Sequence, residues 1–123
     1  MIPITPEIQQ NQLPEILKNL LNDRLNVSLT QITEFCQYWN IIEFALFGSV
    51  LRDDFRLDSD IDILVTFSPD YRLTFKDWMA MKQQIEELFE RKVDLTQKEL
   101  LKNPYTRSEI LKTYQVIYAA EQP

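Results

Sequence analysis

Apolar side chains recur at helical spacing in two stretches near the start of the chain. After Leu13-Pro14, one apolar stripe predicts a helix that caps the core or, as the alternative, docks a partner: Ile16, Leu17, Leu20 and Leu21. A second helix is predicted from Ser28 to Asn40, where Ser28 and Gln31 fit a capping box. Its apolar face consists of Leu29, Ile32, Phe35, Cys36 and Trp39. We expect residues 1–12, which are polar and contain prolines, to form a loosely held arm.

Three stretches have the pattern of β-strands. Ile41 to Phe47 is mostly apolar, which is typical of a strand buried on both faces. From Asp60 the chain alternates, with Ile61, Ile63, Val65 and Phe67 on one side and Asp60, Asp62, Leu64 and Thr66 on the other. Lys92 to Thr96 predicts a third strand, with Asp94 on its polar face.

The longest helix is predicted from Thr74 to roughly Arg91, and Thr74 with Asp77 resembles a capping box. We expect its core face to be Phe75, Trp78, Met79, Ile85, Leu88 and Phe89. Asn103-Pro104 interrupts the chain, after which residues 108–112 look helical. Residues 114–119 fit either a short final strand or a continued helix.

This order of elements predicts an α/β (α+β) fold in which helices pack on a mixed sheet. We divide the chain into an N-terminal arm and helix, residues 1–25, and one domain, residues 26–123. A short polar segment after Gly48 is expected to form one or two helical turns before the second strand begins.

Composition excludes several classes of function. The chain has no histidine, which removes Ser-His-Asp and Cys-His catalysis and histidine-bearing zinc sites. Its net charge of −6 argues against sequence-independent binding to nucleic acid. The single cysteine, Cys36, fits a buried small hydrophobe. No apolar run is long enough to span a membrane, and the N-terminus lacks signal-peptide features, so we expect a cytoplasmic protein.

The candidate chemistry lies in carboxylates around a glycine turn. Asp60 and Asp62 stand about 6–7 Å apart along one side of a strand, where a divalent ion converts their repulsion into coordination. Asp94 adds a third carboxylate, and two Mg²⁺ or Mn²⁺ ions shared by three acids suit nucleotidyl transfer. Gly48, the only glycine, lets phosphate oxygens approach the backbone, Ser49 adds a hydroxyl, and Arg52 follows one helical turn later.

Simpler interpretations remain for each of these residues. Asp58-Ser59-Asp60-Ile61-Asp62 matches the start of a calcium loop, but Ile63 and Pro69 occupy the positions that need a glycine and an acid. Taken singly, Asp60 fits the start of a strand, and Asp62 and Asp94 fit exposed strand positions. A Gly-Ser dipeptide alone indicates little.

The spacing of the whole set is more specific. Gly48-Ser49, ten residues, and then Asp60-Ile61-Asp62 resembles the signature of the polymerase-β-like nucleotidyltransferase superfamily. Gly-Ser-x-x-Arg with Ser59-Asp-Ile-Asp-Ile-Leu-Val resembles its smallest members, the minimal nucleotidyltransferase (MNT) proteins, antitoxins of HEPN/MNT toxin–antitoxin pairs. The resemblance covers roughly residues 26 to 119.

The resemblance implies a mixed sheet flanked by helices and a site for ATP and magnesium. Asp60, Asp62 and Asp94 would bind metal and act in catalysis, with Asp94 helping to deprotonate the acceptor. Gly48, Ser49, Arg52 and Ser59 would bind nucleotide. The activity implied is transfer of AMP from ATP to a tyrosine of a HEPN ribonuclease toxin, which silences the toxin.

Two departures from the family pattern bear on this expectation. Many relatives follow the arginine with a glycine where this chain has Asp53, and the helical domain of larger relatives is missing, so the acceptor surface is expected to come from a partner. Two alternatives stay open. One is a non-catalytic antitoxin that neutralises its partner by binding alone, and the other is a nucleotidyltransferase acting on a small molecule.

Overall fold

A computed structural model describes residues 14–52, 55–56 and 58–120. The elements are α2 (Glu15–Arg24), α3 (Leu29–Tyr38), β1 (Ile41–Phe47), the 3-10 turn η1 (Gly48–Leu51), β2 (Ile61–Phe67), α4 (Phe75–Phe89), β3 (Val93–Gln97), the 3-10 turn η2 (Lys98–Leu100), α5 (Pro104–Thr113) and β4 (Gln115–Ala119). The predicted arm, residues 1–12, and Asp53 lie outside the described residues.

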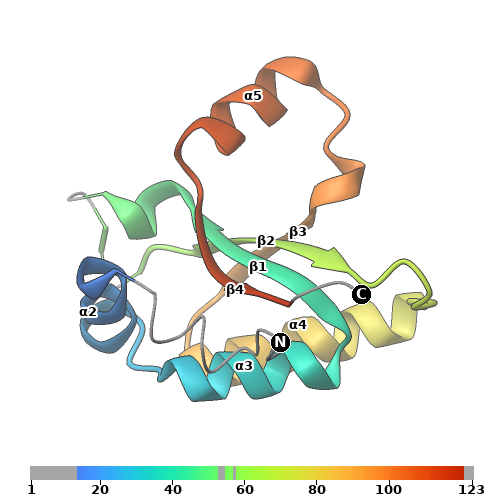
Figure 1. Cartoon of the computed structure of the whole chain (residues 1–123). Helices are drawn as coiled ribbons and strands as arrows, with labels where there is room; N and C mark the ends of the chain where they lie inside the picture. The colour runs from blue at the N-terminus through green and yellow to red at the C-terminus, as the bar shows by residue number, and fades with distance from the viewer. Residues whose placement is uncertain (1–13, 53–54, 57, 121–123) are drawn as a thin grey trace, which may run out of the picture.

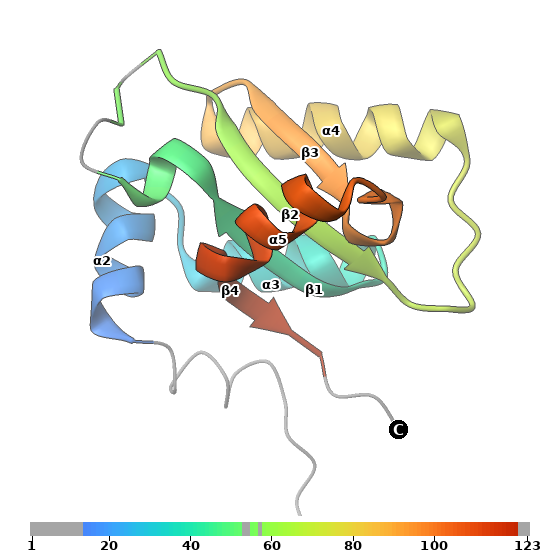
Figure 2. The same ribbon diagram turned by 90° about the horizontal axis from the view of Figure 1, so that it is seen from above.

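The strands form one mixed sheet in the order β3-β2-β1-β4 (Figures 1 and 2). β1 runs antiparallel to both β2 and β4, and β2 runs parallel to β3, to which α4 connects it. Helices α3 and α4 lie against one face of the sheet, while η2 and α5 stand on the other (Figure 1). The predicted α/β class with helices around a mixed sheet is therefore confirmed.

The core lies between the sheet and helices α3 and α4. Ile61, Ile63 and Val65 of β2 are completely buried there, as their alternation predicts. Cys36 is also completely buried, and its burial raises the pKa of its thiol well above the usual value. Leu17 and Leu21 of α2 join the same core, which confirms that this helix caps it. The boundary between residues 25 and 26 stays a prediction.

Local capping signals form as the sequence predicts. Ser28 and Gln31 make both hydrogen bonds of a capping box at the start of α3, and Thr74 and Asp77 do the same for α4. Asn40 ends the first helix–strand connection with a positive φ of 60°. No helix in the described part of the chain is long and apolar enough to cross a membrane.

Two predictions for the core face of α4 are wrong. Phe75 is 79% exposed and Met79 is 49% exposed, whereas Met81 is fully buried. The buried stripe follows Met81, Ile85 and Phe89 at intervals of four residues. Phe75 and Met79 are also four residues apart, but they lie on a different stripe that points away from the sheet.

The C-terminal helix begins earlier than predicted, at Pro104 instead of residue 108. The Asn103 side chain accepts hydrogen bonds from the amides of Tyr105 and Thr106, and proline is well suited to the first helical position. Asn103-Pro104 therefore starts a helix where we expected only an interruption. The following segment is the strand β4, which settles the alternative left open by the sequence.

The two methionines of α4 provide a matched test of this core. Met81→Ala is expected to lower the free energy of unfolding by about 2–5 kcal/mol, because it opens a cavity in a fully buried position. Met79→Ala, the same change at a half-exposed position, is expected to cost less than about 0.5 kcal/mol. Urea denaturation measures both values. Equal losses of unfolding free energy would mean that the core stripe of α4 is assigned wrongly.

Candidate active site

A glycine turn and an aspartate occupy adjoining positions at one end of β1 and β2. Gly48 follows β1 with φ +77°, a backbone conformation that side chains other than glycine's rarely adopt. A Cβ at this position would overlap Oδ2 of Asp62 and lie 3.1 Å from its Cγ. The close approach arises because Phe47, the residue before the glycine, pairs with Asp62 across the antiparallel strands. The chain's only glycine therefore makes room for the Asp62 carboxylate.

Asp94 lies on the other side of Asp62. The parallel strands β2 and β3 place Asp62 opposite Asp94, so both carboxylates start from neighbouring positions on the same face of the sheet. That face is opposite the core face, which holds Ile61 and Ile63. Asp60 immediately precedes β2 and is exposed, as is Asp94, while Asp62 is half-buried. The structure thus brings Gly48, Asp62 and Asp94 together across three neighbouring strands.

The charges in this site act on one another. The pKa of Asp62 is raised above its ordinary 3.8, first by loss of hydration and then by the negative charges of Asp94 and Asp60. The positive charge of Arg52 acts in the opposite direction and lowers it. The other two predicted acids, Asp60 and Asp94, and Arg52 are therefore within electrostatic reach of Asp62. A bound cation would relieve the repulsion among the carboxylates.

The raised pKa predicts how this site affects stability. The folded state holds the Asp62 proton more tightly than the unfolded state does. The stabilisation is therefore complete below pH 3.8 and is lost as the pH rises through the folded-state pKa. Asparagine resembles the protonated acid, so Asp62→Asn is expected to raise the Tm of the metal-free protein at pH 7. This gain should vanish at pH 3, where the parent carboxyl is already protonated.

Thermal unfolding with a chelator, at both pH values, measures this effect. Asp70→Asn is the matched control, since Asp70 is exposed in the turn after β2 and loses the same charge. An Asp62→Asn protein that is no more stable than its parent at pH 7 would contradict the electrostatic description of the site.

The donor chemistry of these side chains fits a divalent ion. Carboxylate oxygens are the hard ligands that Mg²⁺ and Mn²⁺ prefer. Within the described residues, no three acidic or cysteine side chains already form a group that could hold a metal ion. Asp62 and Asp94 are in register, and the exposed Asp60 and Asp94 can change rotamer at little cost. The residues therefore fit a cation that gathers them, and they do not form a closed cage beforehand.

The remaining predicted residues are divided between the turn and the loop. Ser49 is half-buried in η1, and its carbonyl accepts a hydrogen bond of 2.9 Å from the Arg52 amide. Ser59 lies just before the acids, where its hydroxyl accepts a hydrogen bond of 3.0 Å from the Arg56 amide. This contact closes the loop ahead of β2, so the Ser59 hydroxyl is engaged within the protein. The contact of Ser59 with nucleotide stays a prediction.

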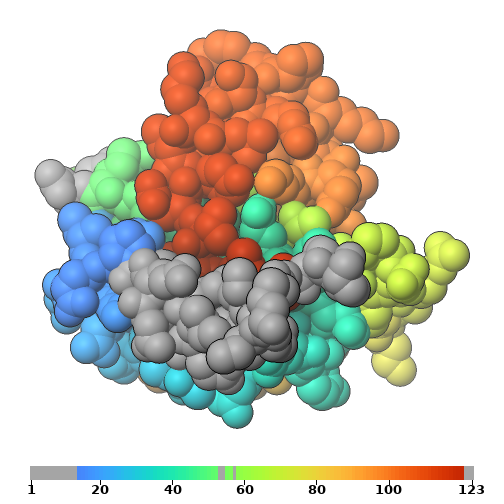
Figure 3. All heavy atoms as spheres, viewed as in Figure 1, coloured from blue at the N-terminus to red at the C-terminus, as the bar shows by residue number. Residues whose placement is uncertain are grey.

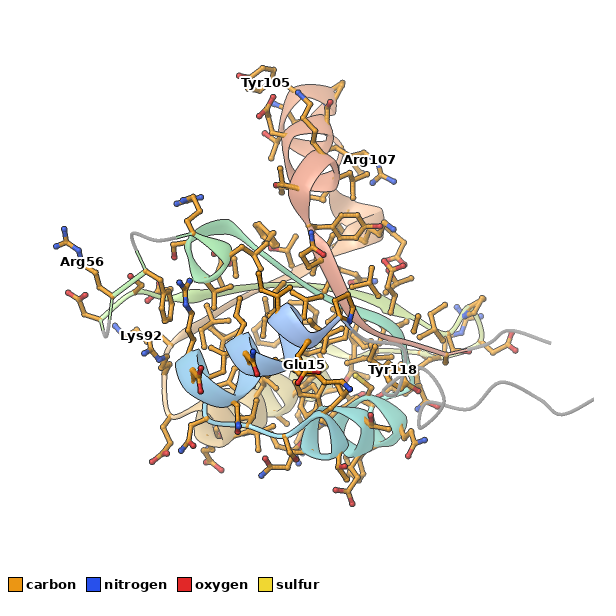
Figure 4. The ribbon with its side chains drawn as sticks, turned by 60° about the vertical axis from the view of Figure 1, so that its left-hand side comes forward. Glu15, Arg56, Lys92, Tyr105, Arg107 and Tyr118 are labelled. Carbon is orange, nitrogen blue, oxygen red and sulfur yellow. The ribbon has the colours of Figure 1, made fainter. Side chains whose placement is uncertain are left out.

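An open cleft of 550 Å³ borders the glycine turn. Its walls are mainly apolar side chains of α2 and η1, together with residues at the end of α5 and the start of β4: Pro14, Ile16, Leu17, Leu20, Gly48, Leu51, Arg52, Thr113 and Gln115. Helix α5 lies on the same side of the sheet as the acids. It contains no buried residue and projects from the molecule (Figure 3). Tyr105 lies at its far end and is 76% exposed (Figure 4).

Sequence reasoning missed the residues that hold this site from outside. Arg24 of α2 donates hydrogen bonds to backbone oxygens of Val50 and Arg52, which are 26 and 28 residues away. Arg91, which follows α4, donates to the backbone oxygens of Arg56 and Ser59. Such distant partners leave no local pattern, and a basic residue in the last turn of a helix is usual in any case.

Comparison with known proteins assigns the chain to a family. The model of the family described as nucleotidyltransferase domain matches residues 30–117. A candidate protein adenylyltransferase of Methanocaldococcus jannaschii is 33% identical over 72 residues, which make up 58% of this chain and 72% of that protein. A second one from the same organism is 38% identical over 74 residues, 58% of this chain and 71% of the relative.

Solved structures share the fold. One described as a minimal nucleotidyltransferase has a TM-score of 0.62 at 28% identity. The match covers 78% of this chain and 93% of the chain in that structure. A toxin–antitoxin structure with AMP-PNP has a TM-score of 0.63 at 17% identity, covering 78% and 77%. The tri-AMPylated HEPN toxin of Shewanella oneidensis in complex with MNT antitoxin gives 0.55 at 16% identity, covering 75% and 70%.

Proposed function

Because the chain belongs to the nucleotidyltransferase domain family, we propose that it is a magnesium-dependent protein adenylyltransferase of the cytoplasm. It transfers AMP from ATP to a tyrosine of a HEPN ribonuclease toxin and thereby neutralises that toxin. One observation carries the proposal: Asp62 lies against the Gly48 turn on one side and in register with Asp94 on the other. A nucleotidyl transfer site needs phosphate-binding backbone and metal-binding carboxylates at this kind of junction.

Each residue has a distinct role in the proposed site. The Gly48 backbone and the Ser49 hydroxyl hold the outer phosphates of ATP, and Arg52 adds positive charge beside them. Asp60, Asp62 and Asp94 would hold the divalent ions, which supply charge that offsets the negative charge of the transfer. Ser59 acts less directly, through the loop that it closes.

The reaction is a displacement at the α-phosphorus. The tyrosine oxygen of the partner forms a bond to this phosphorus, while the bond to the bridging oxygen of the β-phosphate breaks and pyrophosphate leaves. The tyrosine proton passes to the Asp94 carboxylate, which is exposed on the surface where a partner can approach. The product is a phosphodiester between AMP and the tyrosine.

The relatives support the choice of a protein acceptor. The proteins of Methanocaldococcus jannaschii are named as adenylyltransferases that act on protein, and the Shewanella toxin is AMPylated in complex with an MNT antitoxin. The similar structure with AMP-PNP, an ATP analogue, supports ATP as the donor. The open cleft beside Gly48 and Arg52 leaves the turn accessible to ligands.

Intact-mass measurement of the partner tests the proposal. The HEPN partner is incubated with this protein, ATP and Mg²⁺, and it is expected to gain mass in whole AMP units on tyrosine. Omitting Mg²⁺ or using the Asp62→Asn protein should leave the mass unchanged, and the Asp70→Asn protein should behave as the parent. A partner that is neutralised without any gain in mass would refute transfer as the mechanism.

Neutralisation by binding alone is a second candidate function. It is favoured by two observations: the three carboxylates are not gathered into a metal-binding group within the described residues, and α5 offers an unburied surface. In that case Asp60→Ala and Asp62→Ala proteins would still suppress toxicity when co-expressed with the partner, with no need for ATP. Loss of suppression in both variants would exclude this alternative.

A further inference from the structure

The segment that joins the glycine turn to the acids is held by an arginine at each end. At the first end, Nη1 of Arg24 donates hydrogen bonds of 2.7 Å to the Val50 oxygen and 2.5 Å to the Arg52 oxygen. These oxygens lie at the end of η1. The turn is also closed by its own hydrogen bond, which the Arg52 amide donates to the Ser49 oxygen. The Val50 side chain is completely buried, so the turn is held both by the packing of this side chain and by the hydrogen bonds from Arg24.

At the second end, Arg91 performs the same task for the loop before β2. Its Nη1 donates to the backbone oxygens of Arg56, at 3.0 Å, and Ser59, at 3.4 Å. The side chain of Arg56 points away from the body of the protein (Figure 4), so Arg91 contacts its backbone. Ser59 directly precedes Asp60, and this contact therefore fixes the backbone from which the acids begin.

A single aromatic ring connects the two arginines. The guanidinium carbon of Arg91 lies 4.5 Å from the centre of the Phe55 ring, and that of Arg24 lies 5.7 Å from it. Both distances are within the range of cation–π attraction. Arg24, Phe55 and Arg91 thus form one unit, which we call the arginine clamp, and it spans from α2 to the end of α4.

We propose that the arginine clamp positions the phosphate-binding turn relative to the carboxylates, with Arg24 as the positioning residue for the turn. The inference rests on the proposed function, since it concerns the same triphosphate site. Arg24 lies in α2, before residues 30–117, so the support comes from outside the range that the family model matches. Among the described residues, Arg24 donates to the backbone oxygens of Val50 and Arg52 and lies over the Phe55 ring, and it acts on the ligand through Gly48–Arg52.

The clamp makes a specific prediction about ligands. The turn contacts the outer phosphates, which ATP has and AMP lacks, so loss of Arg24 should weaken binding of the triphosphate and not of the monophosphate. Guanidinium geometry matters because one nitrogen serves two carbonyl oxygens while the planar group also faces the ring. Lysine retains the charge but lacks the planar group that lies over the Phe55 ring, so it should restore binding partly.

Titration calorimetry with Mg²⁺ and either AMP-PNP or AMP tests this inference on the full chain. Arg24→Met keeps the aliphatic stem and removes the donors, and it is expected to weaken AMP-PNP binding by about 10- to 100-fold, as loss of supporting contacts does at other sites. AMP binding should stay at the parent value, and Arg24→Lys should fall between the two. Arg72→Met is the matched control, because Arg72 is exposed between β2 and α4.

Thermal unfolding of each variant separates positioning from folding. Arg24→Met with parental affinity for AMP-PNP would overturn the inference. An equal loss for AMP-PNP and AMP, together with a lower Tm, would also overturn it, since that result describes a purely structural contact. If the parent protein itself fails to bind AMP-PNP with Mg²⁺, the proposed function fails first, which is a different outcome from parental binding in the variant.

Discussion

Replacing Asp62 by asparagine is expected to lower AMP transfer by about a thousandfold. Asp62 lies against the glycine turn and is in register with a second acid, so its loss affects both halves of the site. Loss of one charge-stabilising group in an active site typically costs about 10²–10³ in rate, and a residue shared by metal and turn belongs at the upper end. Single-turnover transfer with excess protein measures the chemical step.

Folding cannot account for this loss, because the same substitution is expected to stabilise the metal-free protein at pH 7. Asp70→Asn removes an equal charge from an exposed turn and should keep the parental rate. Transfer by Asp62→Asn within tenfold of the parent would mean that Asp62 is not part of the catalytic machinery.

Gly48→Ala is expected to lower transfer by about a hundredfold. The new methyl group would overlap Oδ2 of Asp62, and the alanine would have to adopt φ +77°. Both the carboxylate and the turn must therefore shift. A displacement of about 1 Å in a positioned group can cost about 10² in rate. The left-handed backbone should also cost about 1–2 kcal/mol of stability.

Asn40→Ala separates these two effects. Asn40 also has a positive φ, 60°, but it lies at the opposite end of β1 from the glycine turn. It should lose stability and retain transfer, whereas Gly48→Ala should lose both. Equal transfer by the two variants would show that the contact between Gly48 and Asp62 has no catalytic importance.

The parts of the fold that follow from short-range physics were predictable. The capping boxes at Ser28 and Thr74 involve residues three apart, and the alternation of β2 needs only its own seven positions. The same local pattern assigned Asp60, Asp62 and Asp94 to polar strand positions. The resemblance to a known family supplied Asp94 as the third acid, but its register with Asp62 was not predicted, since pairing of β2 with β3 depends on the whole sheet.

Features that depend on distant contacts could not be predicted. Helical periodicity in α4 could not show which of two stripes faces the sheet, so Phe75 and Met79 were assigned to the core wrongly. Arg24 belongs to the same class, because its partners Val50 and Arg52 become neighbours only when α2 packs beside η1. The contact between Gly48 and Asp62 likewise arises from strand pairing, although each residue stood out in the sequence.

Tracing the two ends of ATP tests the central claim most directly. The HEPN partner is incubated with this protein and Mg²⁺, once with ATP labelled at the α-phosphate and once with ATP labelled at the γ-phosphate. The α-label is expected to stay on the partner's tyrosine, the γ-label to leave as pyrophosphate, and Asp62→Asn to transfer neither. Retention of the γ-label, or full α-labelling with Asp62→Asn, would contradict nucleotidyl transfer by this site.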